Sequence, residues 1–462
     1  MTRIGVALSG GGHRASVWGA GLLLYLADAG RHREIGVIAS VSGGSITNGV
    51  VAHEMDYRQA SAADVRAGVR SLLRHIAYTG LFFWGPSTNL YVVTVLAIFG
   101  LGVLGFAAGL VMAFITGIGI VPGLVLAGSL IVLAVGVLVF AQRSKVVDHA
   151  LARTHFSREG RPTGLARVAR SLDHVFCATE LQAGEHFYFS PRFLYSYRFG
   201  CGLPGDLALS TAVQASACLP GAFAARRLAT IPYRFQRSSE ITEPAKAPGQ
   251  MLLTDGGVYD NMADQWAGGL AARIRDNAAL QVMTQALDEL IVANASAGPK
   301  WTPVRASWLP IRNEITALVR VKDVQYAVST STRRHDLVTL WDAAARAGRG
   351  VMGALVHIAQ SPFEVPDAFV HDSRWPDRSA RARDAIAWLG DTESNRAAWT
   401  RIADQSRKLP TVLRKLGPDA TARLLWHSYV LAACNLHVLL PDFGLPRLLP
   451  AESEFRELIG EL

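Results

Sequence analysis

The sequence predicts an α/β fold that is interrupted by a two-helix transmembrane hairpin and continues into a mainly helical C-terminal part. Two observations predict this arrangement. Short apolar runs bounded by glycine- and serine-rich turns occur at residues 4–8, 35–39, 252–255 and 290–295, and such runs are typical of buried strands. Between the second and the third run lies a long segment without any charged residue, which is typical of membrane-spanning helices.

The first strand, residues 4–8, leads into a glycine-rich loop, Ser9-Gly10-Gly11-Gly12-His13-Arg14, and then into a helix expected over 16–29. Three consecutive glycines allow backbone N–H groups to converge at the helix N-terminus, where the partial positive charge favours an anion. Such a loop can bind a phosphate or the oxyanion of an acyl-transfer intermediate.

A nucleotide site is the alternative for this loop, because Gly10, Gly12 and Ala15 satisfy the loose G-x-G-x-x-G/A dinucleotide pattern. That pattern also needs an acidic residue at the end of the second strand to bind the ribose. The second strand ends instead in Ala39-Ser40-Val41-Ser42, and no Gly-Lys-Ser/Thr of a Walker loop follows the glycines. The sequence therefore favours the oxyanion.

The second strand, residues 35–39, is followed by a serine among small residues, Ser40-Val41-Ser42-Gly43-Gly44. At a sharp strand-to-helix turn such a serine exposes its hydroxyl above the end of the sheet. The usual pattern is G-x-S-x-G, and Ser40 stands where the first glycine would be. Ser42 is therefore a candidate nucleophile, and a turn serine or helix N-cap is the alternative.

The third element is Leu252-Leu253-Thr254-Asp255-Gly256-Gly257, an apolar strand that ends in a carboxylate on a glycine turn. Asp-Gly on its own is most often a plain turn. An aspartate within hydrogen-bond reach of a serine, however, takes the serine proton during attack and acts as a general base. Asp255 is the candidate for that role.

In this order the three elements resemble the patatin-like phospholipases and acyl hydrolases, whose pattern is a Gly-Gly-Gly-x-Arg loop, a G-x-S-x-G elbow and a downstream Asp-Gly-Gly/Ala. Two further blocks are similar, one at 177–185 with 188–190 and one at 215–223. The resemblance implies a three-layer α/β/α sheet domain that hydrolyses lipid acyl esters with a Ser-Asp dyad, in which Ser42 is the nucleophile and Asp255 the base.

The resemblance also implies an oxyanion hole formed by the N–H groups of Gly11 and Gly12, with Gly10 as a further candidate. Arg14 would brace this loop or assist the charge. A Ser-His-Asp triad is the alternative mechanism, because four histidines follow the candidate base in the order found in α/β-hydrolases. None of them stands in a sequence context that marks it as catalytic: His335, His357, His427 and His437.

The uncharged segment covers the 68 residues between Arg74 and Arg143. One membrane span needs about 20 apolar residues, so two helices are expected, at about 90–115 and 120–141. A buried core hairpin is the alternative, but core helices seldom lack a polar face over such a length. The spacings Gly105-x-x-x-Gly109 and Gly119-x-x-x-Gly123 would let the two helices approach closely.

Basic residues flank the hairpin on both sides, and an even number of spans leaves both flanks on one face of the membrane. We therefore expect a protein integral to a cell membrane, the bacterial inner membrane, with a cytoplasmic catalytic domain and no cleavable signal peptide. The flanking basic residues are Arg58, Arg66, Arg70, Arg74, Arg143, Lys145, Arg153, Arg158 and Arg161.

The composition agrees with a membrane location, because half of the residues are hydrophobic and the formal net charge is +9. A basic balance suits an anionic lipid surface, and no nucleic-acid recognition motif competes with that explanation. The four cysteines lack metal or redox spacing and are expected to be buried, reduced thiols. We expect no cofactor and no metal.

We divide the chain into a first part of the catalytic domain (1–60), an insertion with the hairpin (61–160), a second part with Asp255 (161–300) and a helical C-terminal extension (301–462). Seven of the ten tryptophans lie in the last part, where a place at the membrane interface and ordinary core packing both account for them. They are Trp301, Trp308, Trp341, Trp375, Trp388, Trp399 and Trp426.

These inferences together predict a membrane-anchored serine lipid acyl hydrolase of the phospholipase A or lysophospholipase type, acting on a phospholipid or lysophospholipid. The alternative is a membrane-associated lipid-binding scaffold, or pseudoenzyme, of the same fold.

Overall fold

The computed structural model describes residues 3–81, 88–236, 247–298 and 307–460, so Trp301 lies outside the described residues. Within them, ten strands form one mixed sheet, and β3 (Ser157–Arg158) with β4 (Arg161–Pro162) form a separate ribbon. The strands of the large sheet are β1 (Ile4–Leu8), β2 (Ile35–Ser40), β5 (Asp173–Glu180), β6 (Glu185–Phe189), β7 (Leu194–Ser196), β8 (Gly200–Gly202), β9 (Arg226–Ala229), β10 (Gln250–Asp255), β11 (Glu289–Asn294) and β12 (Met352–His357).

The centre of the sheet is parallel, in the order β12-β11-β1-β2-β5. Beyond β5 the strands β6, β7 and β8 continue antiparallel. The strand β10 pairs antiparallel with the second half of β5 and with β9. The α/β fold is confirmed, and the loops after β1 and β2 lie at the same edge because parallel strands share one carboxyl end.

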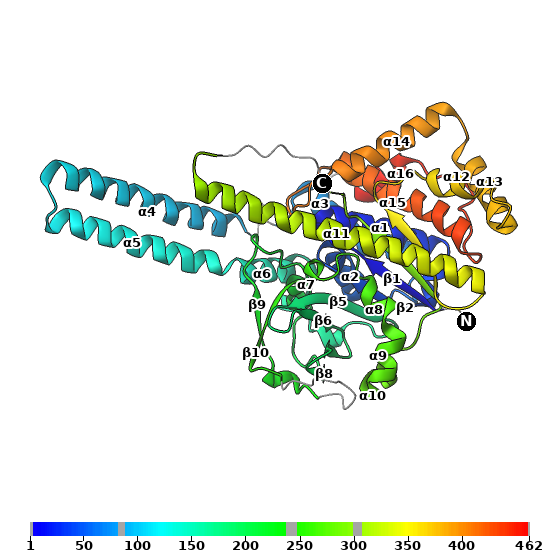
Figure 1. The fold of residues 1–462 in the computed structure, drawn as a ribbon, viewed down its shortest axis with the longest axis horizontal. Coiled ribbons are helices and arrows are strands. Elements are labelled where there is room, and N and C mark those ends of the chain that lie inside the picture. Colours follow the sequence, from blue (N-terminus) through cyan, green and yellow to red (C-terminus); the bar gives the residue numbers. More distant parts are fainter. Residues whose placement is uncertain (1–2, 82–87, 237–246, 299–306, 461–462) are drawn as a thin grey trace.

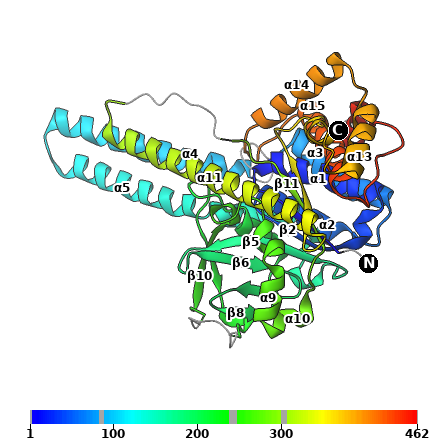
Figure 2. The same cartoon turned by 45° about the vertical axis from the view of Figure 1, so that its right-hand side comes forward.

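Helices cover both faces of the sheet, as the three-layer arrangement requires (Figures 1 and 2). Successive residues of β1 point to opposite faces, because Val6 and Leu8 belong to one hydrophobic core and Ala7 to the other. The first core packs under the helices α1 (Gly12–Asp28), α2 (Gly43–Glu54), α3 (Ala62–Tyr78) and α15 (Pro418–Leu439). The second packs under α8 (Asp264–Gly268), α9 (Leu270–Asp276) and the second half of α11 (Pro310–Ala347), which contributes Leu337 and Trp341.

The helices before the hairpin are α1 (Gly12–Asp28), α2 (Gly43–Glu54) and α3 (Ala62–Tyr78). The helix α1 begins earlier than the expected residue 16, because the Ala15 N–H already donates to the Gly11 carbonyl. After the hairpin follow α6 (Arg143–His155), α7 (Leu209–Ser216), α8 (Asp264–Gly268), α9 (Leu270–Asp276), α10 (Ala278–Met283) and α11 (Pro310–Ala347).

The C-terminal part is mainly helical, as expected, with α12 (Glu364–Phe369), α13 (Pro376–Leu389), α14 (Glu393–Lys408), α15 (Pro418–Leu439) and α16 (Glu452–Ile459). The helix α15 lies close against α1, since a Cβ on Gly21 would be 2.6 Å from the Cβ of Ser428. This part also supplies β12, a strand that the sequence did not predict. All four cysteines are free and buried.

The hairpin consists of α4 (Asn89–Thr116) and α5 (Ile120–Ala141), which project together from the body of the protein (Figure 1). Both are long and apolar enough to cross a membrane. Only 17% and 11% of their most apolar windows are buried inside the protein, whereas a core helix is mostly buried. The bounds agree with the expected 90–115 and 120–141 to within one residue.

Glycines of α4 bring the two helices of the hairpin together. A Cβ on Gly105 or Gly109 would lie 2.6 or 2.8 Å from side-chain atoms of Ser129 or Leu126 on α5. The predicted contact at Gly105 and Gly109 is therefore confirmed. The one at 119–123 is wrong, because Gly123 in the first turn of α5 has no neighbouring atom within 4 Å.

Candidate active site

Two strands from distant parts of the chain meet along one edge of β5. The strand β2 ends at Ser40, which pairs with Phe176 of β5. The strand β10 ends at Asp255, which pairs with Ala178 of β5. The two strands run in opposite directions, so their carboxyl ends approach each other. Their partners on β5, Phe176 and Ala178, are two residues and therefore about 7 Å apart along that strand. This convergence brings the turn that carries Ser42 towards Asp255.

Ser42 forms a sharp turn between β2 and α2. Its φ of 52° and ψ of −119° are unusual for a residue with a side chain, and strained residues of this kind gather at functional sites. A Cβ on Gly43 would lie 1.9 Å from the Gly12 carbonyl oxygen, and one on Gly44 would lie 2.5 Å from that of Leu8. Glycine is therefore required where the turn passes the loop after β1. Ser42 remains half-buried, whereas both of its neighbours in sequence are buried.

The end of α7 holds both candidate catalytic residues through backbone hydrogen bonds. The Ser42 N–H donates to the Ser216 carbonyl oxygen at 3.2 Å and to its Oγ at 3.1 Å. Two residues further on, the Cys218 carbonyl accepts from the Asp255 N–H at 3.0 Å and from the Thr254 hydroxyl at 2.9 Å. The segment 216–218 thus fixes the spacing of Ser42 and Asp255.

The strand β5 supports the same two residues from the other side. The Ser216 hydroxyl donates to the Cys177 carbonyl at 2.6 Å, and the Thr179 hydroxyl donates to the Asp255 carbonyl at 2.9 Å. The blocks at 177–185 and 215–223, which were singled out only by resemblance, therefore contact the site directly.

Asn261 lies between the glycine loop and Asp255, and the sequence did not single it out. A Cβ on Gly10 would lie 2.3 Å from Asn261 Oδ1 and 3.2 Å from Ser42 Cβ. A Cβ on Gly257 would lie 2.6 Å from the same Oδ1 and 2.9 Å from Asp255 Oδ1. The only sequence signal available was an amide side chain shortly after the Asp-Gly-Gly turn.

The three glycines of the loop have different hydrogen-bond partners. The Gly10 N–H donates to the Asn261 carbonyl at 2.9 Å. In the part of the chain that the structure describes, the N–H groups of Gly11 and Gly12 donate to no protein acceptor. Both have positive φ, 144° and 58°, and they stand at the N-terminus of α1, where an anion is favoured.

His13 and Arg14 fasten the loop to the distant segment 409–414. The Arg14 guanidinium donates to the Leu409 carbonyl at 2.7 Å, and burial lowers its pKa to about 10. The His13 ring nitrogen Nδ1 lies 2.9 Å from the Arg414 carbonyl, so it carries the proton and donates. Burial lowers the His13 pKa to about 4, so this imidazole is neutral near pH 7. No sequence pattern pointed to 409–414.

Three of the four histidines considered for a triad bind other groups. Both ring nitrogens of His427 are engaged, with the Ser406 hydroxyl at 3.0 Å and the Gln360 carbonyl at 2.9 Å. His357 contacts the carbonyl of Ser296. His437 likewise contacts the carbonyl of Phe443. These contacts favour the dyad over the triad.

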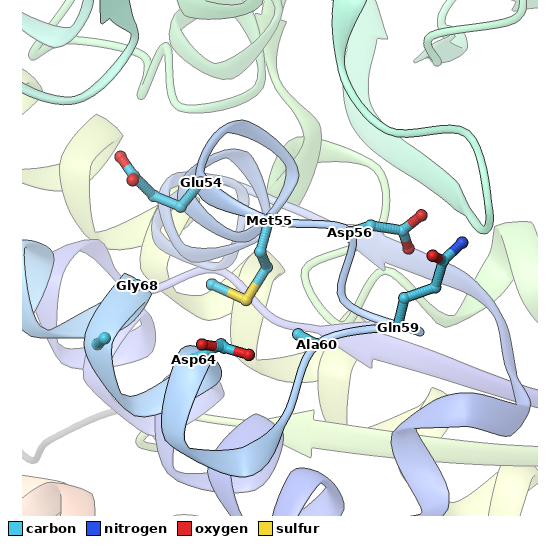
Figure 3. A pocket seen from close by; sticks show the side chains of 8 residues that line it. Glu54, Met55, Asp56, Gln59, Ala60, Asp64 and Gly68 are labelled. Carbon is cyan, nitrogen blue, oxygen red and sulfur yellow. The ribbon is translucent and has the colours of Figure 1, made fainter.

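A hollow of about 540 Å³ lies at the opposite end of α2 from Ser42 (Figure 3). Three carboxylates and the side chain of Met55 surround it, so it suits neither an acyl chain nor an anionic headgroup. Its lining consists of Glu54, Met55, Asp56, Gln59, Ala60, Asp64, Ala67 and Gly68.

Comparison with known proteins identifies one family: the model described as patatin-like phospholipase matches residues 6–263. Among solved structures, human GIVD cytosolic phospholipase A2 matches with 13% identity and a TM-score of 0.31, covering 63% of this chain and 45% of that one. Its complex with methyl gamma-linolenyl fluorophosphonate and terbium chloride matches with 14% identity and a TM-score of 0.35, covering 64% and 41%.

VipD from Legionella pneumophila matches with 13% identity and a TM-score of 0.25, covering 100% of this chain and 88% of that one. The chain spans less than half the length of the two cytosolic phospholipase A2 chains. None of the curated proteins matches it.

Proposed function

Because the chain belongs to the patatin-like phospholipase family, we propose that it is a membrane-anchored serine lipid acyl hydrolase. The nucleophile is Ser42 and the general base is Asp255. The observation that supports this proposal is the convergence of β2 and β10 on one edge of β5, with a strained, half-buried serine in the turn after one strand and a buried aspartate at the end of the other. The substrate is a phospholipid or a lysophospholipid.

The reaction proceeds in two steps. As Ser42 Oγ attacks the ester carbonyl, the Asp255 carboxylate takes the hydroxyl proton and returns it to the departing alcohol, which leaves an acyl-enzyme. The N–H groups of Gly11 and Gly12 stabilise the negative oxygen of the intermediate. Water then attacks the acyl-enzyme with Asp255 again as base, and the fatty acid is released. Gly10 and Arg14 hold the loop in place.

The hairpin of α4 and α5 anchors the enzyme in the bacterial inner membrane, and the basic flanks keep the catalytic domain cytoplasmic. The exposed apolar side chains of both helices and the absence of any charge in their sequences support this placement. In the proposed organisation the insertion 61–160 interrupts one catalytic domain, because β1 and β2 before it share a sheet with β5 and β10 after it.

Labelling with a fluorophosphonate probe tests the proposed chemistry in the full-length, detergent-solubilised protein. The unaltered protein and a Ser61→Ala control, whose hydroxyl caps α3 at the surface, should label and hydrolyse a short-chain ester. Ser42→Ala should lose both activities. Asp255→Asn should slow both at least about 100-fold, because it removes the proton acceptor while keeping the shape of the side chain.

Labelling that persists in Ser42→Ala would place the nucleophile elsewhere. A folded, unaltered protein that neither labels nor hydrolyses would identify the lipid-binding scaffold instead.

A further inference from the structure

The beginning of α11 carries an apolar face that no other part of the described chain covers. The side chains of Ile311, Ile315 and Leu318 are 70%, 57% and 70% exposed, and Trp308 just before the helix is 88% exposed. Their spacing of three or four residues puts them on one side of the helix. Isolated exposed apolar residues are common, but a continuous face of this kind marks an interaction surface.

From Tyr326 onwards, α11 is fixed to the body of the protein. Tyr326 lies beside the candidate active site, since a Cβ on Gly257 would be 3.0 Å from its Cε1. Further along, the Arg333 guanidinium forms an ion pair with Asp264, and Trp341 is buried in the core. The exposed first turns therefore project from a firmly attached helix about 57 Å long.

These first turns project in the same direction as the hairpin. In both views the N-terminal end of α11 extends beyond the sheet on the side where α4 and α5 leave it (Figures 1 and 2). Within the described residues 307–321, Arg312 and Arg320 are basic and Glu314 is acidic. An apolar face next to basic side chains and an exposed tryptophan is the composition of a helix in the headgroup region of an anionic membrane.

We propose that the first turns of α11 are a second lipid-binding element, which enters the headgroup region of the same leaflet in which the hairpin is anchored. This inference rests on the membrane anchoring in the proposed function. The apolar face contacts acyl chains, and Arg312 contacts lipid phosphates. Because the same helix reaches Gly257, its membrane contact positions the catalytic domain against the leaflet.

Single-cysteine probes test this contact in the full-length protein reconstituted into vesicles of phosphatidylcholine and phosphatidylglycerol. The native cysteines are buried, so an environment-sensitive fluorophore labels an introduced surface thiol. On Ile315→Cys its emission should shift to the blue and be quenched by doxyl-labelled lipid. On Ala343→Cys, an exposed position near the opposite end of α11, it should be neither shifted nor quenched.

A third probe on Leu104→Cys, in the middle of α4, separates two possible failures. Quenching at 104 without quenching at 315 would overturn the inference about α11 and leave the anchoring intact. Absence of quenching at 104 would overturn the anchoring itself. A disulfide between two copies of Ile315→Cys without lipid quenching would identify a second copy of the chain as the occupant of the face, which also overturns the inference.

The variant Ile311→Glu with Ile315→Glu tests the consequence for turnover. Hydrolysis of vesicle phospholipid should fall at least about tenfold, because two carboxylates oppose entry into an anionic leaflet. Labelling by fluorophosphonate in detergent should remain unchanged. Unchanged vesicle hydrolysis, or loss of labelling as well, would overturn the inference.

Discussion

Beneath the turn that carries Ser42, the hydroxyl of Ser40 is the centre of a buried hydrogen-bond network. It donates to the Val175 carbonyl at 3.1 Å and accepts from Ser45 Oγ at 3.0 Å and from Asn48 Nδ2 at 2.9 Å. The Ser40 hydroxyl thus uses its donor and both of its acceptor positions, and a buried group satisfied in this way makes its surroundings rigid. Serine in place of the usual glycine therefore adds support under the turn, and its presence is compatible with a working site.

The glycine loop gives a prediction at the residue scale. Gly12→Ala places a Cβ 2.6 Å from the Val412 carbonyl oxygen, at a φ of 58° that disfavours a side chain. The loop must therefore move, and its N–H groups no longer point towards the proposed oxyanion. We expect ester turnover to fall about 100-fold or more, as when one oxyanion donor is lost.

Gly160→Ala is the matched control, because its φ is also positive, at 74°, yet no atom lies within 4 Å of the added Cβ. It should keep turnover within a few-fold. Equal turnover in the two variants, measured with a soluble short-chain ester, would show that the loop does not contribute to catalysis.

The residues proposed from the sequence are those whose local pattern is itself informative. Each of these patterns imposes a backbone geometry that consecutive residues are enough to predict. They are the glycine run, the serine among small residues and the Asp-Gly-Gly turn. Asn261 and the segment 409–414 were missed because their importance lies in contacts with Gly10, His13 and Arg14, which are far away in sequence. No local pattern encodes such contacts.

At the scale of elements, α11 is attached next to the candidate site by a buried ion pair. Arg333 pairs with Asp264 and lies 3.6 Å from Asp260, and both carboxylates are 1% exposed. Burial, together with the negative charge of Asp260, raises the pKa of Asp264 to about 7 in spite of the arginine. Removing one partner of a buried pair leaves an uncompensated charge.

Arg333→Met should therefore detach α11 in a pH-dependent way. An acid whose pKa is raised on folding contributes stability below its unfolded pKa, near 4, and this contribution is lost as the pH rises through the folded value. The variant should lower the thermal unfolding midpoint clearly at pH 8 and much less at pH 5.5, where Asp264 is protonated.

Asp264→Asn in the same chain should restore the midpoint of Arg333→Met at pH 8. Arg346→Ala breaks an exposed ion pair with Asp342 on the same helix and should have little effect at either pH. A loss in Arg333→Met that does not depend on pH would show that the arginine acts through packing.

The elements themselves were predictable where hydrophobicity decides the outcome. The bounds of α4 and α5 were within one residue, because two long apolar runs separated by a glycine-containing break define two helices directly. The strand β12 was missed because its short apolar run lies among helical sequences, and only pairing with β11 makes it a strand. The start of α1 was misplaced because glycines normally disfavour a helix, whereas here Gly11 is the N-cap of α1 and Gly12 is its first residue.

At the scale of the whole molecule, the base of the hairpin is tied to the segment that holds the candidate catalytic residues. The Arg143 guanidinium donates to the Ala222 carbonyl at 2.9 Å, and the Ser144 hydroxyl donates to the carbonyl of Ala224. The Cys218 thiol donates to the same Ala224 carbonyl at 2.9 Å. The proposed anchor and the proposed site are therefore joined by a few hydrogen bonds.

Replacing residues 95–136 by a linker of about six glycines and serines tests whether the hairpin only anchors the protein. Such a linker spans about 20 Å, enough to join the two helix stumps. Because Tyr91, Arg143 and Ser144 keep their contacts at the base, hydrolysis of a soluble ester should remain within a few-fold, while retention by vesicles should fall sharply.

The same deletion combined with Tyr91→Phe tests whether the contact between the two helix stumps matters, because the Tyr91 hydroxyl donates to the Val139 carbonyl at 3.1 Å. A folded linker variant that no longer cleaves the soluble ester would show that the hairpin shapes the site. One that stays on vesicles through its apolar α11 face would assign that face a larger share of the binding.

A catalytic centre joined in this way to the proposed membrane anchor would work in two dimensions. The relevant measure of substrate is then its mole fraction among the surrounding lipids, since the tether fixes the effective concentration that the site experiences. Diluting a suspension of loaded vesicles with buffer should leave the rate per enzyme unchanged. Mixing inert lipid into the same vesicles should lower the rate per enzyme in proportion to the mole fraction of substrate. The composition of the membrane would then determine the rate.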